Sequence, residues 1–357
     1  MKAAFPFIGY DSLALKDFLT VLGAEVCLPP PLTKKTLELG AKYSPEMVCL
    51  PFKITLGNFI EALENGADTL FMAAGARKCR FGYYHHLQEK ILKELGYQFR
   101  FYPVSQYSPY EFFFEKMPQI FNVSPLKVLR AFYLMFKKSE TCENFKNCLR
   151  VIRAIDYKES IRFERKYLKK IETAKKIKAL NILNKELKTK RKKFLKEGEI
   201  KLKIGLVGEI YFLLEDFANQ EIEKELGKLG VLVLSKRSLY RRLKHLLKIE
   251  VDFLKIYYYA KKYLPLSPGG EAMNTVGEAI EFAKNGIDGV IHIFPFTCMP
   301  ENIVLHSLEK ISEEYNLPIL SLSFDEHTSK TGLLTRIEAF LELLKRRKRN
   351  GTRLYRH

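Results

Sequence analysis

The stretch GNFIEALENGADTLFM (residues 57–72) is repeated in altered form as GEAIEFAKNGIDGVIH (residues 277–292). In each copy the pattern predicts a helix that ends at an Asn-Gly-x-Asp turn and leads into an apolar strand. The glycine of that turn suits the left-handed conformation in which many helices end. The repeat therefore indicates two copies of one α/β design. The shared pairs, at a constant offset of 220, are Gly57/Gly277, Ile60/Ile280, Glu61/Glu281, Asn65/Asn285, Gly66/Gly286 and Asp68/Asp288.

Around each copy, short apolar strands alternate with helical patterns, which favours a parallel, doubly wound sheet. DTLFMAA (68–74) is apolar without alternation, as expected of a strand covered on both faces. Helices are expected over 54–65, 215–229 and 331–346, among others. The sequence thus predicts an α/β fold with two Rossmann/flavodoxin-like domains joined by a helical segment. The expected boundaries are 1–108 and 201–345 for the α/β domains, 109–200 for the basic helical segment, and 346–357 for a basic tail.

The net charge of +19 is confined to two segments. Residues 157–203 hold 18 Lys and Arg against 6 Asp and Glu, and residues 345–357 hold 7 against none. Solvated helix faces and a frayed terminus are the ordinary explanation. Attraction to an acidic partner or to a phosphate-bearing ligand is the functional one. Nucleic acid is not the expected partner, because no recognition motif accompanies the charge.

Three of the six cysteines lie where ligand-binding loops are expected. Cys79 and Cys298 follow Asp68 and Asp288 by 11 and 10 residues, so each lies beyond the carboxyl end of an equivalent strand. Open α/β sheets bind ligands at that edge. Cys49 lies in the loop before the helix of the first copy. Three thiolates from three loops suit a cubane iron–sulfur cluster with one open iron, although a zinc site fits the same spacing.

The other three cysteines are expected to be structural. A chain without a secretory signal is not expected to form disulfides. Cys27 ends a strand and is expected in the core or beside the cluster, with a role as the fourth ligand as the alternative. Cys142 and Cys148 are six residues apart in the helical segment and do not share a helix face.

Four stretches carry a resemblance to a known family. They are CLPFKITLGNFIEALENGADTLFMAAGARKCRFGYY (49–84), KIGLVGEIY (203–211), FPFTCMPENIV (294–304) and DEHTSKTGLLTRIEAF (325–340). In these the chain resembles the 2-hydroxyacyl-CoA dehydratase subunits. It is more similar still to the acyl-CoA dehydratase activase-related proteins, also called CoA-substrate-specific enzyme activase-related. The stretches occur in the right order across both α/β domains, whereas residues 109–200 and the basic tail give no match.

The resemblance implies that Cys49, Cys79 and Cys298 bind a [4Fe–4S] cluster, or a larger linked cluster as in double-cubane relatives, so that both α/β domains are cluster-binding. It implies low-potential electrons from an ATP-hydrolysing activator, and reduction or dehydration of a small or CoA-linked substrate. The dehydratases use the electron to form a ketyl radical from a CoA thioester. The protein would then be an oxygen-sensitive enzyme of anaerobic metabolism, either a radical-type dehydratase (lyase) or an ATP-dependent reductase component.

The same resemblance implies a homodimer or a heterodimer with a related subunit. A separate activator is expected because Gly205 and Gly208 give only G-x-x-G after a strand, which is weak as a nucleotide signal. A non-catalytic electron-transfer or cluster-bearing partner subunit is the alternative function. A structural zinc protein or a nucleic-acid binder is the third.

Several charged residues near the matching stretches are expected beside the cluster. Lys53, Arg77 and Arg80 flank two cysteines, where positive charge favours thiolates and a reduced cluster. Ordinary surface basicity is their alternative. Arg336 would anchor a loop or neutralise cluster charge, with a plain salt bridge as the alternative.

Polar residues at strand ends form a second group of candidates. Glu326 and His327, with Asp325, follow a strand and would act as a proton relay, or simply as a helix cap. Glu209 and Tyr211 would line a cleft or pack in the core. His85 and His86 are weaker candidates for any site.

The sequence gives no sign of a membrane segment. No apolar run reaches the ~20 residues that a membrane helix needs. The N-terminal MKAAFPFIGYDSLALKDF is interrupted by Asp11 and Lys16 and does not resemble a secretory signal. A cytoplasmic protein is therefore expected.

Overall fold

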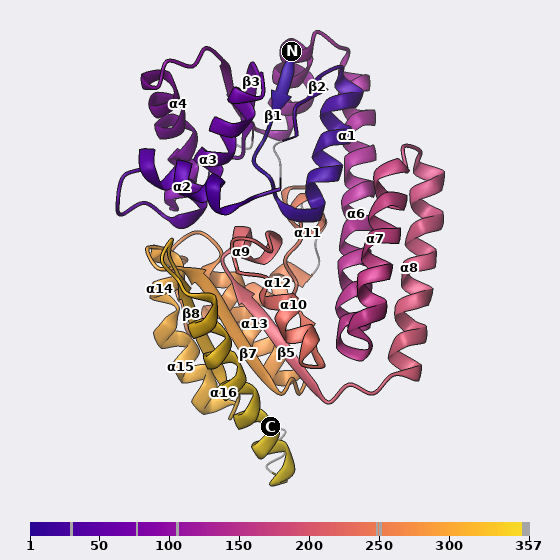
Figure 1. The fold of residues 1–357 in the computed structure, drawn as a ribbon, viewed down its shortest axis with the longest axis vertical. Coiled ribbons are helices and arrows are strands. Elements are labelled where there is room, and N and C mark those ends of the chain that lie inside the picture. The colour runs from indigo at the N-terminus through magenta and orange to yellow at the C-terminus, as the bar shows by residue number, and fades with distance from the viewer. Residues whose placement is uncertain (29–30, 76–77, 105–106, 248, 250–251, 352–357) are drawn as a thin grey trace. The chain divides into compact units, whose positions relative to one another are not determined.

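A computed structural model describes residues 1–28, 31–75, 78–104, 107–247, 249 and 252–351 (Figure 1). The chain divides into two compact units. The first is Met1–Cys142 with Ile171–Asn181, and the second is Glu143–Lys170 with Ile182–His357. Each unit contains a four-stranded, all-parallel sheet flanked by helices, in the order β2-β1-β3-β4 in the first and β6-β5-β7-β8 in the second. The predicted α/β fold with two Rossmann/flavodoxin-like domains is confirmed.

The strands are short, and the central strands β3 and β7 are buried along their whole length. The first sheet consists of β1 (Lys2–Ala4), β2 (Glu25–Val26), β3 (Thr69–Met72) and β4 (Arg100–Pro103). The second consists of β5 (Leu202–Gly208), β6 (Val231–Leu234), β7 (Gly289–Pro295) and β8 (Ile319–Phe324). In both sheets the order reverses between the first and third strands, and ligands of open α/β sheets bind at the carboxyl end of such a switch point.

Helices make up most of the remaining chain. Those before residue 125 are η1 (Gly9–Asp11), α1 (Ser12–Leu22), α2 (Lys34–Tyr43), α3 (Leu50–Glu64), η2 (Arg80–Tyr83), α4 (Tyr84–Glu94), the π-helix η4 (Glu111–Lys116) and α5 (Met117–Phe121). Three long helices follow: α6 (Pro125–Ile155), α7 (Tyr157–Thr173) and α8 (Ile177–Glu197). The rest are α9 (Ile210–Leu214), α10 (Ile222–Lys228), α11 (Leu239–Leu246), α12 (Asp252–Lys261), α13 (Ala272–Lys284), α14 (Met299–Ile303), α15 (Leu305–Glu314) and α16 (Lys330–Arg349).

The first glycine of the repeat allows two helices to pack closely in both units. A Cβ atom on Gly57 of α3 would lie 1.9 Å from the Thr36 carbonyl oxygen of α2. A Cβ atom on Gly277 of α13 would lie 2.2 Å from the Ile256 carbonyl oxygen of α12. Glycine is therefore needed in each unit because a neighbouring helix backbone comes too close for any side chain.

The turn of the repeat also has one geometry. Gly66 and Gly286 have φ values of +86° and +65°, as the sequence predicts for helix-ending glycines. The carboxylate that follows accepts a hydrogen bond from the first strand of its own sheet. Asp68 Oδ1 accepts from the Lys2 amide at 3.0 Å, and Asp288 Oδ2 accepts from the Lys203 amide at 2.7 Å.

Three predicted helix boundaries need correction. The helix expected over 54–65 begins at Leu50, where Pro51 occupies its first turn and suits that position. The helix expected over 215–229 is α10, which begins only at Ile222, because Gln220 and Glu221 have φ values of +55° and +62° and interrupt helical geometry. The last helix continues to Arg349, beyond the expected end at 346.

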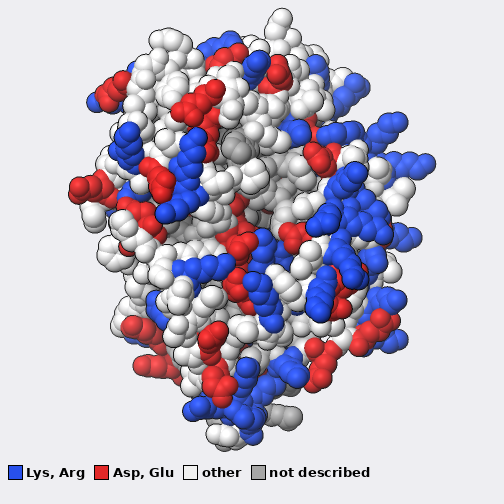
Figure 2. Space-filling model, in the orientation of Figure 1, with Lys and Arg blue, Asp and Glu red and all other residues white. Residues whose placement is uncertain are grey.

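The segment 109–200 is helical, as expected, and its residues divide between the two units. Leu134, Ala174 and Leu180 form a small core in the first unit. Phe145 and Phe163 stack in the second, with ring centroids 5.7 Å apart. Lysines and arginines of α7 and α8 gather on the surface over these helices (Figure 2). Within the described residues, every helix is too short or too polar to cross a membrane.

Candidate functional site

Cys49 and Cys298 occupy matching local positions, each as the residue that precedes a helix. Cys49 is the N-cap of α3, and Cys298 is the N-cap of α14. Each is followed two residues later by a proline, Pro51 or Pro300, which cannot donate a backbone hydrogen bond and so favours a helix start there. Both cysteines are nearly buried, with exposed fractions of 7% and 6%. The helix N-terminus at each site favours a negatively charged group.

In the first unit, the loops of Cys49 and Cys79 are joined. Cys79 is partly buried and precedes η2. The next residue, Arg80, donates from Nη1 to the carbonyl oxygen of Met47, at 2.9 Å. The helices that follow the two loops also touch, since the rings of Phe52 in α3 and Tyr84 in α4 meet edge to face with centroids 5.0 Å apart. The first unit therefore brings two of the three predicted cysteine loops side by side.

Lys53, the expected neighbour of Cys49, is buried in the first turn of α3. Its ammonium group therefore lies inside the first unit and not on its surface. Arg77, the other cation expected here, lies outside the described residues. His85 is also buried near this region, beside His86, and its burial lowers the pKa of the imidazole.

In the second unit, a buried polar chain anchors the helix that follows Cys298. Glu301 lies three residues after Cys298 and is fully buried. Its Oε2 is 2.8 Å from Nε2 of His292, in the middle of β7, and its Oε1 accepts from Thr275 Oγ1 of α13 at 3.2 Å. The other imidazole nitrogen, Nδ1, lies 3.2 Å from Ser321 Oγ of β8. Burial in an apolar core makes these pairings necessary, because unpaired polar groups there are costly.

At the switch point of the second sheet, β5 ends at Gly208 with a φ of +133°, and a Cβ atom there would lie 1.9 Å from the Ile293 carbonyl oxygen. Glu209 follows and caps α9, accepting from the Phe212 amide at 3.0 Å. Burial outweighs this hydrogen bond and raises the pKa of Glu209 to about 7. Burial also raises the pKa of Tyr211. Glu209 and Tyr211 are therefore packed at the carboxyl end of β5.

The residues expected at the end of β8 form a local turn. Asp325 Oδ1 accepts from the His327 amide at 3.0 Å and from Thr328 Oγ1 at 2.8 Å. His327 is exposed and Glu326 is partly buried. Arg336 of α16 donates to the carbonyl oxygen of Ser321, at 2.9 Å, and so ties α16 to β8. Asp325 therefore fixes a local turn and does not cap α16, whose N-cap is Ser329, and Arg336 anchors a strand.

The remaining cysteines lie in structural positions. Cys27 Sγ is 3.8 Å from the carbonyl oxygen of Asn65, at the carboxyl end of α3, whereas Cys49 precedes the amino end. The 15 residues of α3 span about 22 Å, so Cys27 lies far from Cys49. Cys142 and Cys148 are buried, and burial raises the pKa of both thiols, that of Cys148 to about 12.

Among the described residues, no group of three or more His, Cys, Asp or Glu side chains is arranged to hold a metal ion. Cys49 and Cys79 belong to the first unit and Cys298 to the second. As donors, the three thiols fit an iron–sulfur cluster or zinc, since soft thiolates are the ligands that both prefer.

Sequence reasoning missed His292 and Glu301. One signal was available, because His292 is the only polar residue within the apolar run GVIHIFPF. A buried histidine in such a run needs a polar partner. The identity of that partner is set by the fold, which brings α14 back over β7.

Two family models match the chain. Residues 127–344 match "2-hydroxyglutaryl-CoA dehydratase, D-component", and residues 7–74 match "CoA enzyme activase uncharacterised domain (DUF2229)". The first match covers more than half of the chain. A search of curated proteins found no match.

The fold and the matched residues define a 2-hydroxyacyl-CoA dehydratase-like component with an activase-related domain. The chain belongs to the 2-hydroxyglutaryl-CoA dehydratase D-component family. Its match begins at residue 127 and thus includes most of the helical segment, which the motif-based resemblance left out. Cys298 lies within this match and Cys49 within the other, whereas Cys79 lies between them.

Proposed function

We propose that this chain is an iron–sulfur component of the dehydratase type, in which Cys49, Cys79 and Cys298 bind a [4Fe–4S] cluster or a double-cubane variant. The supporting observation is the position of the cysteines. Two of them lie in adjoining loops of the first unit, and the third precedes a helix at the corresponding strand end of the second. When bound, such a cluster supplies one-electron transfer at low potential. An ATP-hydrolysing activator is the proposed electron donor.

The chain's own residues would support the cluster by position and charge. Arg80 holds the loops of Cys49 and Cys79 together and places a guanidinium beside them. Lys53 would add a buried positive charge one helical turn after Cys49. Positive charge near thiolates favours their ionised form. In the second unit, the pairing of His292 with Glu301 holds α14, and with it Cys298, against the sheet.

The proposed reaction is reduction or dehydration of a small or CoA-linked substrate. Glu326 and His327 would contribute polar groups near the cluster, and Arg336 a nearby positive charge. A dimer, either of this chain or with a related subunit, is the proposed assembly.

The test is anaerobic reconstitution followed by iron and sulfide analysis. Cys49→Ala, Cys79→Ala and Cys298→Ala should each lose iron, whereas Cys142→Ala, a buried cysteine outside the site, should keep it. Colourless protein that carries zinc, or full iron in Cys298→Ala, would contradict the proposal. Turnover of an acyl-CoA with an ATP-driven activator would distinguish an enzyme from an electron-transfer subunit.

A further inference from the structure

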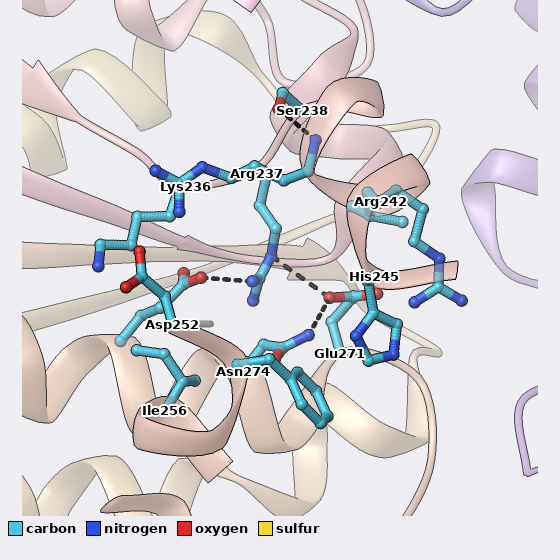
Figure 3. A pocket seen from close by; sticks show the side chains of 13 residues that line it. Lys236, Arg237, Ser238, Arg242, His245, Asp252, Ile256, Glu271 and Asn274 are labelled. Atoms are coloured by element: carbon cyan, nitrogen blue, oxygen red, sulfur yellow. Dashed lines mark hydrogen bonds and ion pairs between the residues drawn. The ribbon is translucent and has the colours of Figure 1, made fainter. Parts of the chain in front are cut away.

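A pocket in the second unit lies beside the carboxyl end of β6, apart from the cysteine loops in sequence. Its walls come from the loop after β6, from α11 and α12, and from the first half of α13 (Figure 3). Its volume is about 490 Å³, including the part open to solvent. Phe253 and Ile256 form an apolar side, while most of the other walls are charged or polar. The carboxyl edge of an open α/β sheet is where ligands commonly bind.

The centre of the pocket is a buried guanidinium. Arg237 is 7% exposed, and its Nη1 donates to Oε1 of Glu278 at 2.5 Å. Its Nε lies 3.4 Å from Oε2 of Glu271, which also accepts from Asn274 Nδ2 at 2.8 Å. Arg237 is therefore fixed between two carboxylates, as Figure 3 shows for Glu271. A buried cation held in this way presents a rigid wall and not a mobile surface charge.

One carboxyl oxygen of a residue that lines the pocket has no hydrogen-bond partner in the part of the chain that the structure describes. Glu278 is 4% exposed, and its Oε2 has no hydrogen-bond partner within the described residues. Burial raises the pKa of Glu278 to about 7, despite the neighbouring Arg237. For Glu271, burial is outweighed by the charges of Arg237 and Arg242, so its pKa is lowered. Near neutral pH, Glu278 can therefore carry a proton and donate a hydrogen bond through its unpartnered oxygen.

At the mouth of the pocket, one arginine makes no ion pair within the described residues. Arg242 lines the pocket from the first turn of α11, and it forms no hydrogen bond or ion pair with the described residues. That turn contains no acidic residue, so Arg241 and Arg242 add to the positive end of the helix dipole. Arg241 is offset by Glu143, at 2.9 Å. Arg242 has no ion-pair partner within the described residues, although its charge contributes to the lowered pKa of Glu271, and a bound anion would supply a direct partner.

We infer that this pocket binds the phosphate or carboxylate group of a small organic anion, with Arg242 as its charge partner, Glu278 Oε2 as a hydrogen-bond partner, and Phe253 and Ile256 in contact with the uncharged part. A cationic ligand is disfavoured because four cationic residues line the pocket, Lys236, Arg237, Arg241 and Arg242, against three acidic ones, Asp252, Glu271 and Glu278. The inference does not rest on the cluster proposal, since every residue involved belongs to the second unit and none is a cysteine.

The test is calorimetric titration of the full-length protein at pH 7 with inorganic phosphate, and separately with acetate. We expect saturable binding of at least one anion, and the stronger of the two identifies the ligand group. Arg242→Gln should weaken binding about tenfold, the size of one charge-assisted hydrogen bond. Lys244→Gln removes the same charge from the same helix outside the pocket, and it should change binding less than about twofold.

Two results would overturn the inference. One is the absence of saturable binding by both anions. The other is an equal loss in Arg242→Gln and Lys244→Gln, which would mean that only the general charge of α11 attracts anions. Arg242 is exposed and forms no ion pair with any described residue, so thermal unfolding of the variant should match that of the unmodified protein and exclude misfolding as the cause.

Discussion

His292 and Glu301 form a fully buried pair, with Nε2 of the imidazole 2.8 Å from Oε2 of the carboxylate. The pair joins the centre of β7 to the short helix α14, which begins directly after Cys298. Thr275 extends the chain of contacts to α13. The position of the Cys298 loop is thus tied to the core of the second sheet.

Glu301→Ala should remove this anchor and leave His292 and Thr275 without their partner. We expect a loss of about 2–3 kcal/mol in the free energy of unfolding, because buried polar groups would lose their hydrogen bonds. Urea unfolding measures the change. Glu309→Ala, at an exposed position on α15, should change stability by less than about 0.5 kcal/mol. Similar stabilities for the two variants would show that the buried pair does not anchor α14.

Gly57→Ala and Gly277→Ala should each be destabilising by at least about 2 kcal/mol, because the added methyl group would collide with a carbonyl oxygen of the adjacent helix. Gly332→Ala is the matched control, since that glycine lies in α16 with open space around it. There alanine should be neutral or stabilising by up to about 1 kcal/mol. Thermal or urea unfolding of the three variants makes the comparison. If Gly57→Ala behaves like Gly332→Ala, the close approach of α2 and α3 is wrong.

Lys138 of α6 is fully buried and paired with Asp17 of α1, which Lys175 also contacts at 2.5 Å. Burial lowers the pKa of Lys138, and Asp17 acts in the opposite direction. Lys138→Ala should cost about 3–5 kcal/mol, because it leaves a buried carboxylate less well compensated. Lys16→Ala, which removes a partly exposed pair with Glu172, should cost less than about 1 kcal/mol.

A double variant, Asp17→Leu with Lys138→Met, tests the mechanism behind that cost. Removing both charges should recover part of the stability lost in Lys138→Ala, since no unpaired buried charge remains. A double variant less stable than the single one would contradict this account. The same unfolding curves provide the measurement.

Glu278 should make stability depend on pH. Its pKa in the folded protein is about 7, above the ordinary value of 4.5, so the folded state binds the proton more tightly. The stabilising contribution is complete below pH 4.5 and is lost as pH rises through 7. Relative to Glu278→Gln, which cannot ionise, the unmodified protein should lose about 1–3 kcal/mol between pH 5 and pH 7.5. Parallel pH–stability curves for the two proteins would exclude the shift.

Much of the fold could be predicted because its signals are local. The apolar strands, the helix-ending glycines Gly66 and Gly286, and the repeated turn each depend on a few neighbouring residues. The late start of α10 could not be predicted, because the positive φ values occur at Gln220 and Glu221, where no glycine or asparagine signals them. The same holds for the requirement for Gly57 and Gly277, since the colliding backbone belongs to another helix.

The sequence by itself determined the parallel α/β class, the duplication, the positions of Cys79 and Cys298 beyond strand ends and that of Cys49 before a helix, because side-chain periodicity and turn chemistry act over short distances. Only the tertiary structure decided that Arg80 joins the loops of Cys49 and Cys79, that His292 pairs with Glu301, and that Arg237 and Glu278 form a pocket wall. These pairings join residues from separate elements. They exist because burial forces each polar group to find whichever partner the folded chain brings within reach.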